Sequence, residues 1–394
     1  MRITGAVLEQ SGRPRPFAGS RPITVCELEL GDPGPTEVLV AIEAAGVCHS
    51  DLSVVDGNRP RPLPMLLGHE AAGTVLATGE RVWDVRPGQR VVMSFLPRCE
   101  QCDACDRQGQ LPCSAGTRTN NAGELLHHSG HLSRAGEPIR HHLGVSGFAT
   151  HAVVDRASVV PVGDDVPPEV AALFGCAVLT GGGAVLNVAN PRPGDGLLVI
   201  GLGGVGMAAV LTAKAIGVER IIAVDRLPEK LALARTLGAT ETYTPEQLSE
   251  AQVRVRYVIE CAGHPAAFET AYAATAPGGT TITVGLPAPQ ATVTLNPLSI
   301  TAEARTVVGS YLGSAVPARD IPRYEQMWRA GLLPVEHLIS ARIGLGEINE
   351  AMDQLADGKA VRQIIVFGAR QTDPEGRPAT AALPANSGMD KEIS

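Results

Sequence analysis

The segment "GDGLLVIGLGGVGMAAVLTAKAIGVERIIAVD" constrains the fold more than any other part of the chain. Its apolar run "LLVI" is followed at once by Gly201, Gly203 and Gly206 in the pattern G-x-G-x-x-G, and then by a helix-length run. Such glycines let a strand turn sharply into a helix whose N-terminus stabilises a pyrophosphate. The second apolar run ends at Asp225, where an acid accepts hydrogen bonds from an adenosine ribose and repels a 2′-phosphate, although Arg226 is the residue type that would accommodate one. The segment therefore predicts a βαβ unit that binds NAD; the alternative is a tight strand-helix turn without a ligand.

The rest of the chain divides by pattern. From Ile3 to about Val162, short β-type runs separated by Gly and Pro turns predict a largely antiparallel domain. From the glycine segment to "TTITVGLP", strand runs alternate with helix-length segments, which indicates a parallel sheet. After about Tyr311 the chain is predicted to be helical and to end its ordered part with the strand "RQIIVFG". The polar, Pro-containing tail beyond Gly368 is expected to be disordered.

Composition excludes some classes of partner. At 394 residues with 44% apolar residues, the chain exceeds the usual size of one domain, so two domains are expected. Its net charge of −8 without a long basic run argues against nucleic acid or an anionic membrane as a partner. We find no signal-peptide pattern and no run of about 18 consecutive apolar residues, so a cytoplasmic location is expected.

Four of the eight cysteines lie in one loop, "CEQCDACDRQGQLPC". They are Cys99, Cys102, Cys105 and Cys113, with the spacing C-x2-C-x2-C-x7-C. Four thiolates satisfy tetrahedral zinc and leave no open position, so a structural zinc site is predicted. An iron-sulfur cluster and disulfides are the alternatives, but a ferredoxin-type run has three residues before its fourth cysteine, and disulfides are rare in a reducing compartment. A DNA-binding zinc module is disfavoured because Glu100, Asp103 and Asp106 offset Arg98 and Arg107.

Three further residues form a potential ligand set for a second metal. Cys48 lies in "GVCHSDL", His69 in "LGHEAAG" and Cys176 in "FGCAVLTGGG". Two thiolates and one imidazole are the ligands of a catalytic zinc whose fourth position is open. Each residue also has a plainer interpretation, as a small buried thiol or a turn histidine, and spacing alone does not bring the three together.

Several motifs together resemble a known family. "GVCHSD", "GHEAAGTV", the four-cysteine loop, "GLGGVG" with Asp225, and "VRQIIVF" occur in the order seen in zinc-containing alcohol dehydrogenases of the medium-chain dehydrogenase/reductase family. The similarity spans Ile3 to Phe367, and "HHLGVSGFATHAVVD" is closest in pattern to the animal-type and glutathione-dependent formaldehyde-oxidising branches.

The resemblance implies an α/β fold of two domains. A GroES-like, mainly antiparallel β catalytic domain is expected over residues 1–177 and completed by residues 320–368. A Rossmann-type doubly wound parallel sheet, residues 178–319, is expected to be inserted into it, and residues 369–394 to form the disordered tail. Strands near "RTVVGSYLGS" are expected to pair across a two-fold axis in a homodimer or homotetramer.

The resemblance also implies roles for individual residues. Cys48, His69 and Cys176 would bind the catalytic zinc with Asp51 and Glu70 behind them, and the four-cysteine loop would bind a second zinc. Cys26 and Cys261 would be plain apolar thiols. Phe95 would line the substrate channel. The expected NAD contacts are Gly201, Gly203, Gly204, Val205 and Gly206 at the pyrophosphate, Asp225 and Lys230 at the ribose, His49 and Arg362 at the phosphates, and Thr180, Val284 and Leu286 at the nicotinamide.

The implied reaction is reversible hydride transfer between a primary or secondary alcohol and NAD, giving an aldehyde or ketone. Ser50 would take the alcohol proton and pass it through the cofactor ribose towards solvent. Two positions depart from the pattern: Ser53 stands where many relatives end this relay on a histidine, and His49 where some have arginine. An imidazole in place of a guanidinium fork weakens a phosphate contact.

Two other functions are considered. A thiol-adduct (S-hydroxymethyl) formaldehyde dehydrogenase would need groups for a charged thiol cofactor, for which Arg118, His127, His128 and His131 are the candidates. A catalytically silent dinucleotide-binding protein with a structural or regulatory role is the other, and the intact Cys48, His69, Cys176 and Ser50 argue against it.

Overall fold

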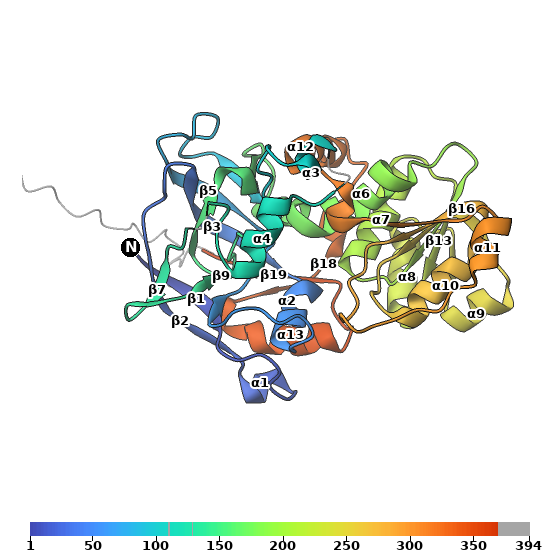
Figure 1. The fold of residues 1–394 in the computed structure, drawn as a ribbon, viewed down its shortest axis with the longest axis horizontal. Helices are drawn as coiled ribbons and strands as arrows, with labels where there is room; N and C mark the ends of the chain where they lie inside the picture. Colours follow the sequence, from blue (N-terminus) through green and yellow to red (C-terminus); the bar gives the residue numbers. More distant parts are fainter. Residues whose placement is uncertain (109–110, 128, 369–394) are drawn as a thin grey trace, which may run out of the picture.

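The computed structural model describes residues 1–108, 111–127 and 129–368 of the chain. The strands of these residues form three sheets, which lie in two halves of the molecule (Figure 1). The predicted disordered tail, residues 369–394, lies outside the described residues and stays a prediction.

Two mainly antiparallel sheets form the half that contains the N-terminus. The first has the order β8 (Glu137–Pro138), β7 (Leu132–Arg134), β2 (Ile23–Leu30), β1 (Arg2–Leu8), β4 (Met65–Leu66) and β9 (Arg140–His141). The second has the order β11 (Val159–Pro161), β6 (Arg90–Met93), β5 (Ala71–Thr78), β3 (Glu37–Val47), β19 (Arg362–Val366) and β18 (Ile339–Ile343), with β10 (His151–Asp155) also paired with β3. Because β19 pairs with β3, the end of the described chain returns to the sheet that its first part began. The predicted antiparallel domain is confirmed; its boundaries stay a prediction.

A parallel sheet forms the other half. Its order is β14 (Glu241–Tyr243), β13 (Arg220–Val224), β12 (Gly196–Ile200), β15 (Val255–Glu260), β16 (Thr275–Thr283) and β17 (Thr306–Gly309). Every neighbouring pair is parallel, and the order reverses on the two sides of β12. This is the Rossmann order, in which a dinucleotide binds in the crevice where the direction reverses. The predicted doubly wound sheet is confirmed.

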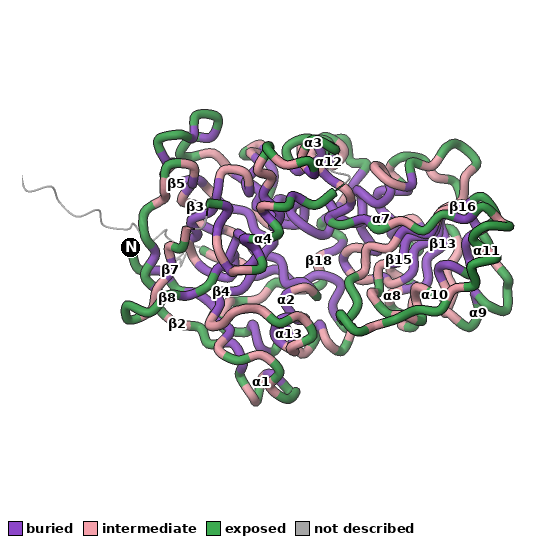
Figure 2. Tube along the Cα trace, in the orientation of Figure 1, coloured by how far each residue is buried: buried purple, intermediate pink, exposed green. Residues whose placement is uncertain are grey.

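Both faces of the parallel sheet are buried. In β12, Leu197 and Val199 belong to one apolar cluster, whereas Leu198 and Ile200 belong to another. Since side chains alternate between faces along a strand, this pattern requires cover on both sides, and helices provide it (Figure 2). The helices are α1 (Phe17–Ser20), α2 (His49–Val55), α3 (Asp103–Asp106), α4 (Ser114–Ala122), α5 (Pro168–Leu173), α6 (Leu179–Gly183), α7 (Gly204–Ala215), α8 (Pro228–Leu237), α9 (Pro245–Glu250), α10 (Pro265–Ala273), α11 (Pro297–Ala302), α12 (Pro317–Arg329) and α13 (Ile348–Ala356).

One helical run, Pro168–Ala189, is by length and composition apolar enough to cross a membrane, among the residues described here. It has 22 residues and a mean hydropathy of 1.7, but 89% of its most apolar window is buried inside this protein. The run contains α5 and α6, which contact β3, β5 and α7. Packing between the two halves therefore accounts for its apolar composition.

Candidate active site

The fold brings Cys48, His69 and Cys176 together from distant parts of the chain. Their ligand atoms, with that of Glu70, lie within 4.8 Å of one another, and all four residues are buried. The spacing of these residues in the sequence did not predict this cluster, whereas the family resemblance did.

Each of the three residues lies at an end or an interruption of a regular element, and these positions bring the side chains together. Cys48 stands between the end of β3 and the start of α2, and His69 lies between β4 and β5. Cys176 lies in a π-helical turn, Phe174–Val178, that interrupts the long buried helix. Such turns insert an extra residue and are frequent at functional sites.

The geometry of the cluster fits zinc. The Cys176 Sγ and His69 Nε2 atoms are 3.4 Å apart. Tetrahedral ligands with bonds of about 2.3 and 2.0 Å would be separated by about 3.5 Å. His69 Nδ1 lies 2.9 Å from Asp51 Oδ1, so the carboxylate accepts the Nδ1 proton and leaves Nε2 free to bind a metal. Two thiols and this nitrogen are the donor set of a catalytic zinc with an open fourth position.

Glu70 and Arg362 are two buried ionisable residues beside this cluster. Burial raises the pKa of Glu70 to about 7, and the positive charge of Arg362 acts against this rise. The Arg362 Nη1 atom lies 3.5 Å from Glu70 Oε2. Within the described part of the chain neither carboxylate oxygen of Glu70 has a hydrogen-bond partner. Gly46 leaves the space for this side chain, because a Cβ atom there would lie 2.4 Å from Glu70 Oε1.

His142 is a neighbour of the cluster that sequence reasoning missed. Its Nδ1 atom lies 3.2 Å from Asp51 Oδ1, and its ring meets the His69 ring edge to face at 5.6 Å. Burial lowers the pKa of His142, so the ring is neutral near pH 7. The pattern of the stretch "HHLGVSG" indicates only a resemblance to one branch of the family. Nothing in this pattern predicts that His142 is a neighbour of Asp51.

The four cysteines of the loop form a second, separate cluster. The Sγ atoms of Cys99, Cys102, Cys105 and Cys113 lie within 4.8 Å of one another, and none of the cysteines forms a disulfide. Cys102 Sγ and Cys105 Sγ are 3.6 Å apart. Four tetrahedral thiolates at about 2.3 Å from zinc would be separated by about 3.8 Å. The cluster therefore fits a closed zinc site, and the described structure gives the disulfide alternative no support.

A cavity of about 720 Å³ extends from the catalytic cluster to the parallel sheet. Most of the predicted site residues line it. They are Cys48, His49, Ser50, Phe95, Cys176, Thr180, Gly201, Gly203, Gly204, Val205, Asp225, Lys230, Val284, Leu286 and Arg362. Asp51, His69 and Glu70 are fully buried and do not line it. The arrangement joins the cluster of potential zinc ligands and the glycine turn through one cavity.

The glycine turn requires glycine at two positions. Gly201 has φ +88°, and a Cβ atom there would lie 2.7 Å from the Ala262 backbone nitrogen, so only glycine fits. A Cβ atom at Gly206 would lie 2.0 Å from the Gly201 carbonyl oxygen, so this glycine lets α7 pack against the turn. The contact of Gly206 with the pyrophosphate stays a prediction. Asp225 Oδ2 accepts the Leu202 N–H at 2.7 Å, which fixes the carboxylate beside the turn.

The groups considered for a charged thiol cofactor do not gather at the cavity. Arg118 is exposed on α4, and the His131 Nε2 atom lies 2.6 Å from Glu37 Oε2. His127 lies 3.5 Å from Asp155, and neither histidine lines the cavity. His128 lies outside the described residues. These positions give the formaldehyde-oxidising alternative no support.

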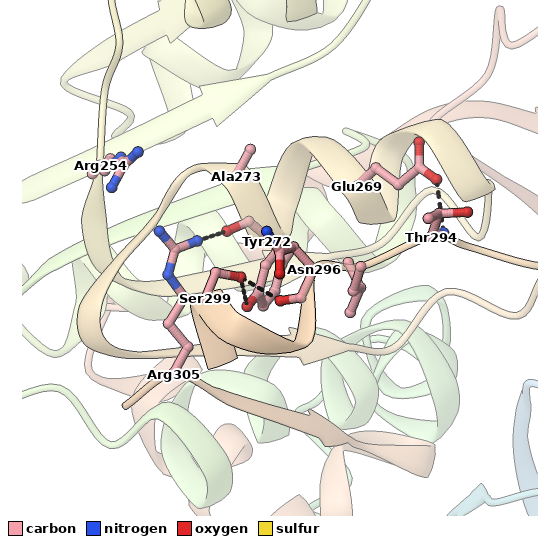
Figure 3. A pocket seen from close by; sticks show the side chains of 9 residues that line it. Arg254, Glu269, Tyr272, Ala273, Thr294, Asn296, Ser299 and Arg305 are labelled. Carbon is pink, nitrogen blue, oxygen red and sulfur yellow. Dashed lines mark hydrogen bonds between the residues drawn. The ribbon is translucent and has the colours of Figure 1, made fainter. Parts of the chain in front are cut away.

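A second hollow, of about 420 Å³, lies between α10 and α11 (Figure 3). Its polar groups bind one another: Tyr272 Oη lies 2.6 Å from Ser299 Oγ, and Arg305 Nη1 donates to the Tyr272 carbonyl at 2.6 Å. Glu269 accepts the Thr294 N–H at 3.1 Å. Because these groups already have partners, the hollow is not a second candidate for chemistry.

Comparison with known proteins shows to which family this chain belongs. Residues 34–164 match the alcohol dehydrogenase GroES-like domain, and residues 204–330 match the zinc-binding dehydrogenases. Geraniol dehydrogenase of Castellaniella defragrans is 37% identical over 372 residues, covering 92% of this chain and 97% of that protein. The chain belongs to the zinc-dependent medium-chain alcohol dehydrogenase family. It is therefore an oxidoreductase, which excludes the catalytically silent alternative.

Solved structures agree with this assignment. Benzyl alcohol dehydrogenase of Acinetobacter calcoaceticus is 29% identical with a TM-score of 0.85, covering 93% of this enzyme and 100% of that chain. A structure from Sinorhizobium meliloti bound to NADP is 25% identical with a TM-score of 0.75, covering 93% of this enzyme and 100% of that chain. Relatives of this fold thus include one that binds NADP, so the cofactor of this enzyme has to be argued from its own residues.

Proposed function

We propose that the enzyme oxidises primary or secondary alcohols reversibly to aldehydes or ketones, with NAD as the hydride acceptor and two zinc ions per chain. The observation that carries the proposal is the cavity that joins the Cys48, His69 and Cys176 cluster to the glycine turn after β12. A catalytic zinc supplies a Lewis acid that stabilises the alkoxide form of an alcohol. NAD supplies a nicotinamide that accepts hydride.

The residues around the cluster support this chemistry. Ser50 lines the cavity two positions after Cys48, which supports the proposal that its hydroxyl accepts the proton of a substrate hydroxyl. The Ser53 hydroxyl donates a hydrogen bond to the His49 carbonyl at 2.9 Å and is thereby turned towards its own helix. The proposed proton path therefore begins at Ser50 and does not depend on a base at position 53.

The cavity wall favours alcohols with an apolar body. The Phe95 ring meets the His69 ring edge to face at 5.4 Å and the Tyr311 ring at 5.8 Å, and both Phe95 and Tyr311 line the cavity. Phe95 is buried, whereas Tyr311 is 36% exposed. Edge-to-face contacts of such rings give this part of the wall an apolar surface. The names of the geraniol and benzyl alcohol dehydrogenases agree with such substrates. We therefore propose allylic and benzylic alcohols as the first to test.

The choice of cofactor, the domain boundaries, the location and the oligomeric state of the enzyme are part of the same proposal. NAD rather than NADP is supported by the Asp225 carboxylate, which would repel a 2′-phosphate beside the turn. The domain boundaries at residues 177 and 319, the cytoplasmic location and the homodimer or homotetramer remain proposals. Closeness to the animal-type and formaldehyde-oxidising branches rests on one sequence stretch and stays a prediction.

The test combines metal content with turnover. Purified enzyme is assayed for NADH and NADPH formation with benzyl alcohol and geraniol, and its zinc is measured in the same sample. We expect two zinc ions per chain, higher kcat/KM with NAD than with NADP, and loss of activity when a chelator removes the more exchangeable zinc. Full activity with one zinc or none, or no turnover of any alcohol with either cofactor, would contradict the proposal.

A further inference from the structure

An arginine on the cavity wall has no part in the reaction proposed above. Arg59 follows α2 and lines the cavity together with Phe95 and Tyr311. Three other basic side chains line it: Arg362 lies beside Gly204 and Glu70, Lys230 beside Gly358, and Arg226 next to Asp225 in the sequence. Arg59 is therefore a positive charge on the wall of the cavity that also contains the Cys48 and Cys176 side chains.

Arg59 and its neighbour Arg61 lack counter-charges. Among the described residues, no carboxylate lies within ion-pair distance of either guanidinium, and Arg59 makes no side-chain hydrogen bond. Arg61 donates to Asn121 Oδ1, but its buried Nε atom has no partner. Burial lowers the pKa of Arg61; Tyr311 acts against this fall, and the Arg59 charge adds to it. Two adjacent cations without an anion are unfavourable unless a ligand completes the site.

Arg59 lies on the wall of the same cavity as two aromatic rings. The His69 ring contacts Phe95 at 5.4 Å, and Phe95 contacts Tyr311 at 5.8 Å, so these rings lead away from the cluster of potential zinc ligands. Burial raises the pKa of Tyr311, and the Arg59 and Arg61 charges act against this rise, in agreement with this placement. The cavity thus combines the cluster of potential zinc ligands, an aromatic wall and the Arg59 charge.

We propose that Arg59, supported by Arg61, binds a carboxylate at the end of the substrate remote from the reacting carbon. The preferred substrates are then hydroxy acids and aldehyde acids with an aromatic or aliphatic segment between the two functional groups. This inference rests on the proposed alcohol dehydrogenase function, and it narrows the substrate class of the same site. Arginine suits the role because its fork matches both carboxylate oxygens.

The test measures binding and turnover for matched pairs that differ only in the charge. 4-(Hydroxymethyl)benzoate is compared with benzyl alcohol, and a series of ω-hydroxyalkanoates is compared with 1-alkanols of the same length. Isothermal titration calorimetry on the zinc-loaded enzyme saturated with NADH gives the dissociation constants without turnover. We expect the best carboxylate to bind about 10-fold to 100-fold more tightly than its neutral partner, with a ratio that falls as salt rises.

Variants test whether Arg59 is responsible. Arg59→Gln should bring the ratio of the two dissociation constants close to one, while Arg59→Lys should keep part of the preference. The neutral alcohol of each pair controls for folding in each variant. Arg81→Gln, which removes an exposed arginine of the loop before β6, should keep the wild-type ratio.

Two results would overturn the inference: no carboxylate of either series binds more tightly than its neutral partner, or Arg59→Gln leaves the ratio unchanged. Failure of the proposed function is a different result, because it would appear as absence of turnover for both members of every pair. In that case the dissociation constants alone would still decide whether Arg59 binds the carboxylate.

Discussion

At the level of single residues, the Asp51 carboxylate organises the catalytic cluster through both of its oxygens. Oδ2 accepts the Cys48 N–H at 3.0 Å, and Oδ1 lies 2.9 Å from His69 Nδ1 and 3.2 Å from His142 Nδ1. One buried side chain thereby positions a thiol ligand and an imidazole ligand. Burial raises the pKa of Asp51, but the two imidazoles outweigh it and lower the pKa, so the carboxylate is ionised at neutral pH.

Asp51→Asn should weaken zinc binding at the catalytic cluster by about 10-fold to 100-fold, because the amide keeps the shape but loses the charge that holds His69 Nδ1–H. Zinc affinity is measured by competition with a chromogenic chelator. Asp56→Asn is the matched control, since Asp56 ends the same helix and binds Asn58. Equal zinc affinity in wild type and Asp51→Asn would show that Asp51 does not position the ligand.

Ser50 and Ser53 offer a second comparison at this scale. Ser50→Ala should lower kcat for alcohol oxidation by about 100-fold to 10,000-fold, the usual range for a lost proton-transfer group. Ser53→Ala should change kcat far less, because the Ser53 hydroxyl is bound to the His49 carbonyl. Steady-state kinetics for both variants, with a check that product release does not limit the rate, measure the difference. Similar losses in the two variants would remove Ser50 from its proposed role.

At the level of elements, the thiols of the two clusters lie on different kinds of segment. The proposed structural thiols lie on the cysteine loop, and the proposed catalytic thiol of Cys176 lies on the buried π-helical turn. Arg98 Nη2 donates to the Ala104 carbonyl at 2.8 Å, and the Cys99 and Gly116 N–H groups donate to Cys113 Sγ at 3.3 and 3.4 Å. Backbone bonds also close a short turn of the loop: the Cys105 and Asp106 N–H groups donate to the Cys102 carbonyl at 2.8 and 3.3 Å. We expect a metal bound by the four sulfur atoms to add to the stability of the loop.

Cys105→Ser should therefore lower the zinc content by one ion and reduce the thermal midpoint and the folded yield. Cys176→Ser should also lose one zinc ion, but it should abolish turnover in a protein that still folds, because the helix carrying it is packed by apolar contacts. Zinc analysis, circular dichroism and kinetics of both variants make the comparison, with Cys26→Ser as the control outside both clusters. Normal zinc content in Cys105→Ser would contradict a four-thiolate site.

Glu37 at the start of β3 makes the antiparallel half sensitive to acid. Burial raises the pKa of Glu37, but hydrogen bonds from His131, Ser129 and the Gly34 N–H outweigh it and lower the pKa from 4.5 to about 2. Since the folded-state pKa is lower than the unfolded one, the stabilisation is present above about pH 4.5 and is lost as the pH falls towards 2.

Glu37→Gln should accordingly lower the free energy of unfolding by up to about 3 kcal/mol at neutral pH, and by progressively less below about pH 4.5. Urea unfolding of wild type and variant between about pH 7 and pH 3.5 measures the difference. Glu27→Gln, an exposed glutamate on β2, is the control and should show no such pH dependence. A difference that stays constant with pH would mean that the charge of Glu37 is not the cause.

The sequence predicted the elements that short-range periodicity and turn glycines specify. It did not by itself predict the features that depend on contacts between distant segments. The strand, glycine turn and helix from Gly196 to Ala215 follow from periodicity and from glycines that the backbone requires. The cluster around Cys48 depends on three segments meeting, which only the family resemblance anticipated. His142 was missed because its neighbour Asp51 is far away in the sequence, and Arg59 because distant segments form the cavity that it lines.

At the level of the whole molecule, the parallel sheet ends in an edge that the chain itself does not cover. Strand β17 pairs with β16 on one side, and no strand of the described residues pairs with its other side. Helix α11, which precedes β17, is at the end of the molecule far from the N-terminus, and Leu298, Ile300 and Val307 are exposed there (Figure 1). Unpaired edges and exposed apolar patches are positions where proteins associate.

We expect β17 to pair with β17 of a second copy around a two-fold axis, which would join two parallel sheets and cover these side chains. The wild-type enzyme should then have at least the mass of a dimer in multi-angle light scattering at micromolar concentration. Leu298→Asp combined with Val307→Asp should shift the mass to that of a monomer, because each carboxylate would have to be buried without a partner. Leu76→Asp is the matched control, since Leu76 is an exposed leucine on β5 in the other half. If the wild type is a monomer, or if Leu76→Asp dissociates the dimer as much as the double variant does, the β17 edge is not the interface. If only the double variant loses the dimer, the interface lies at that edge, away from the catalytic cavity.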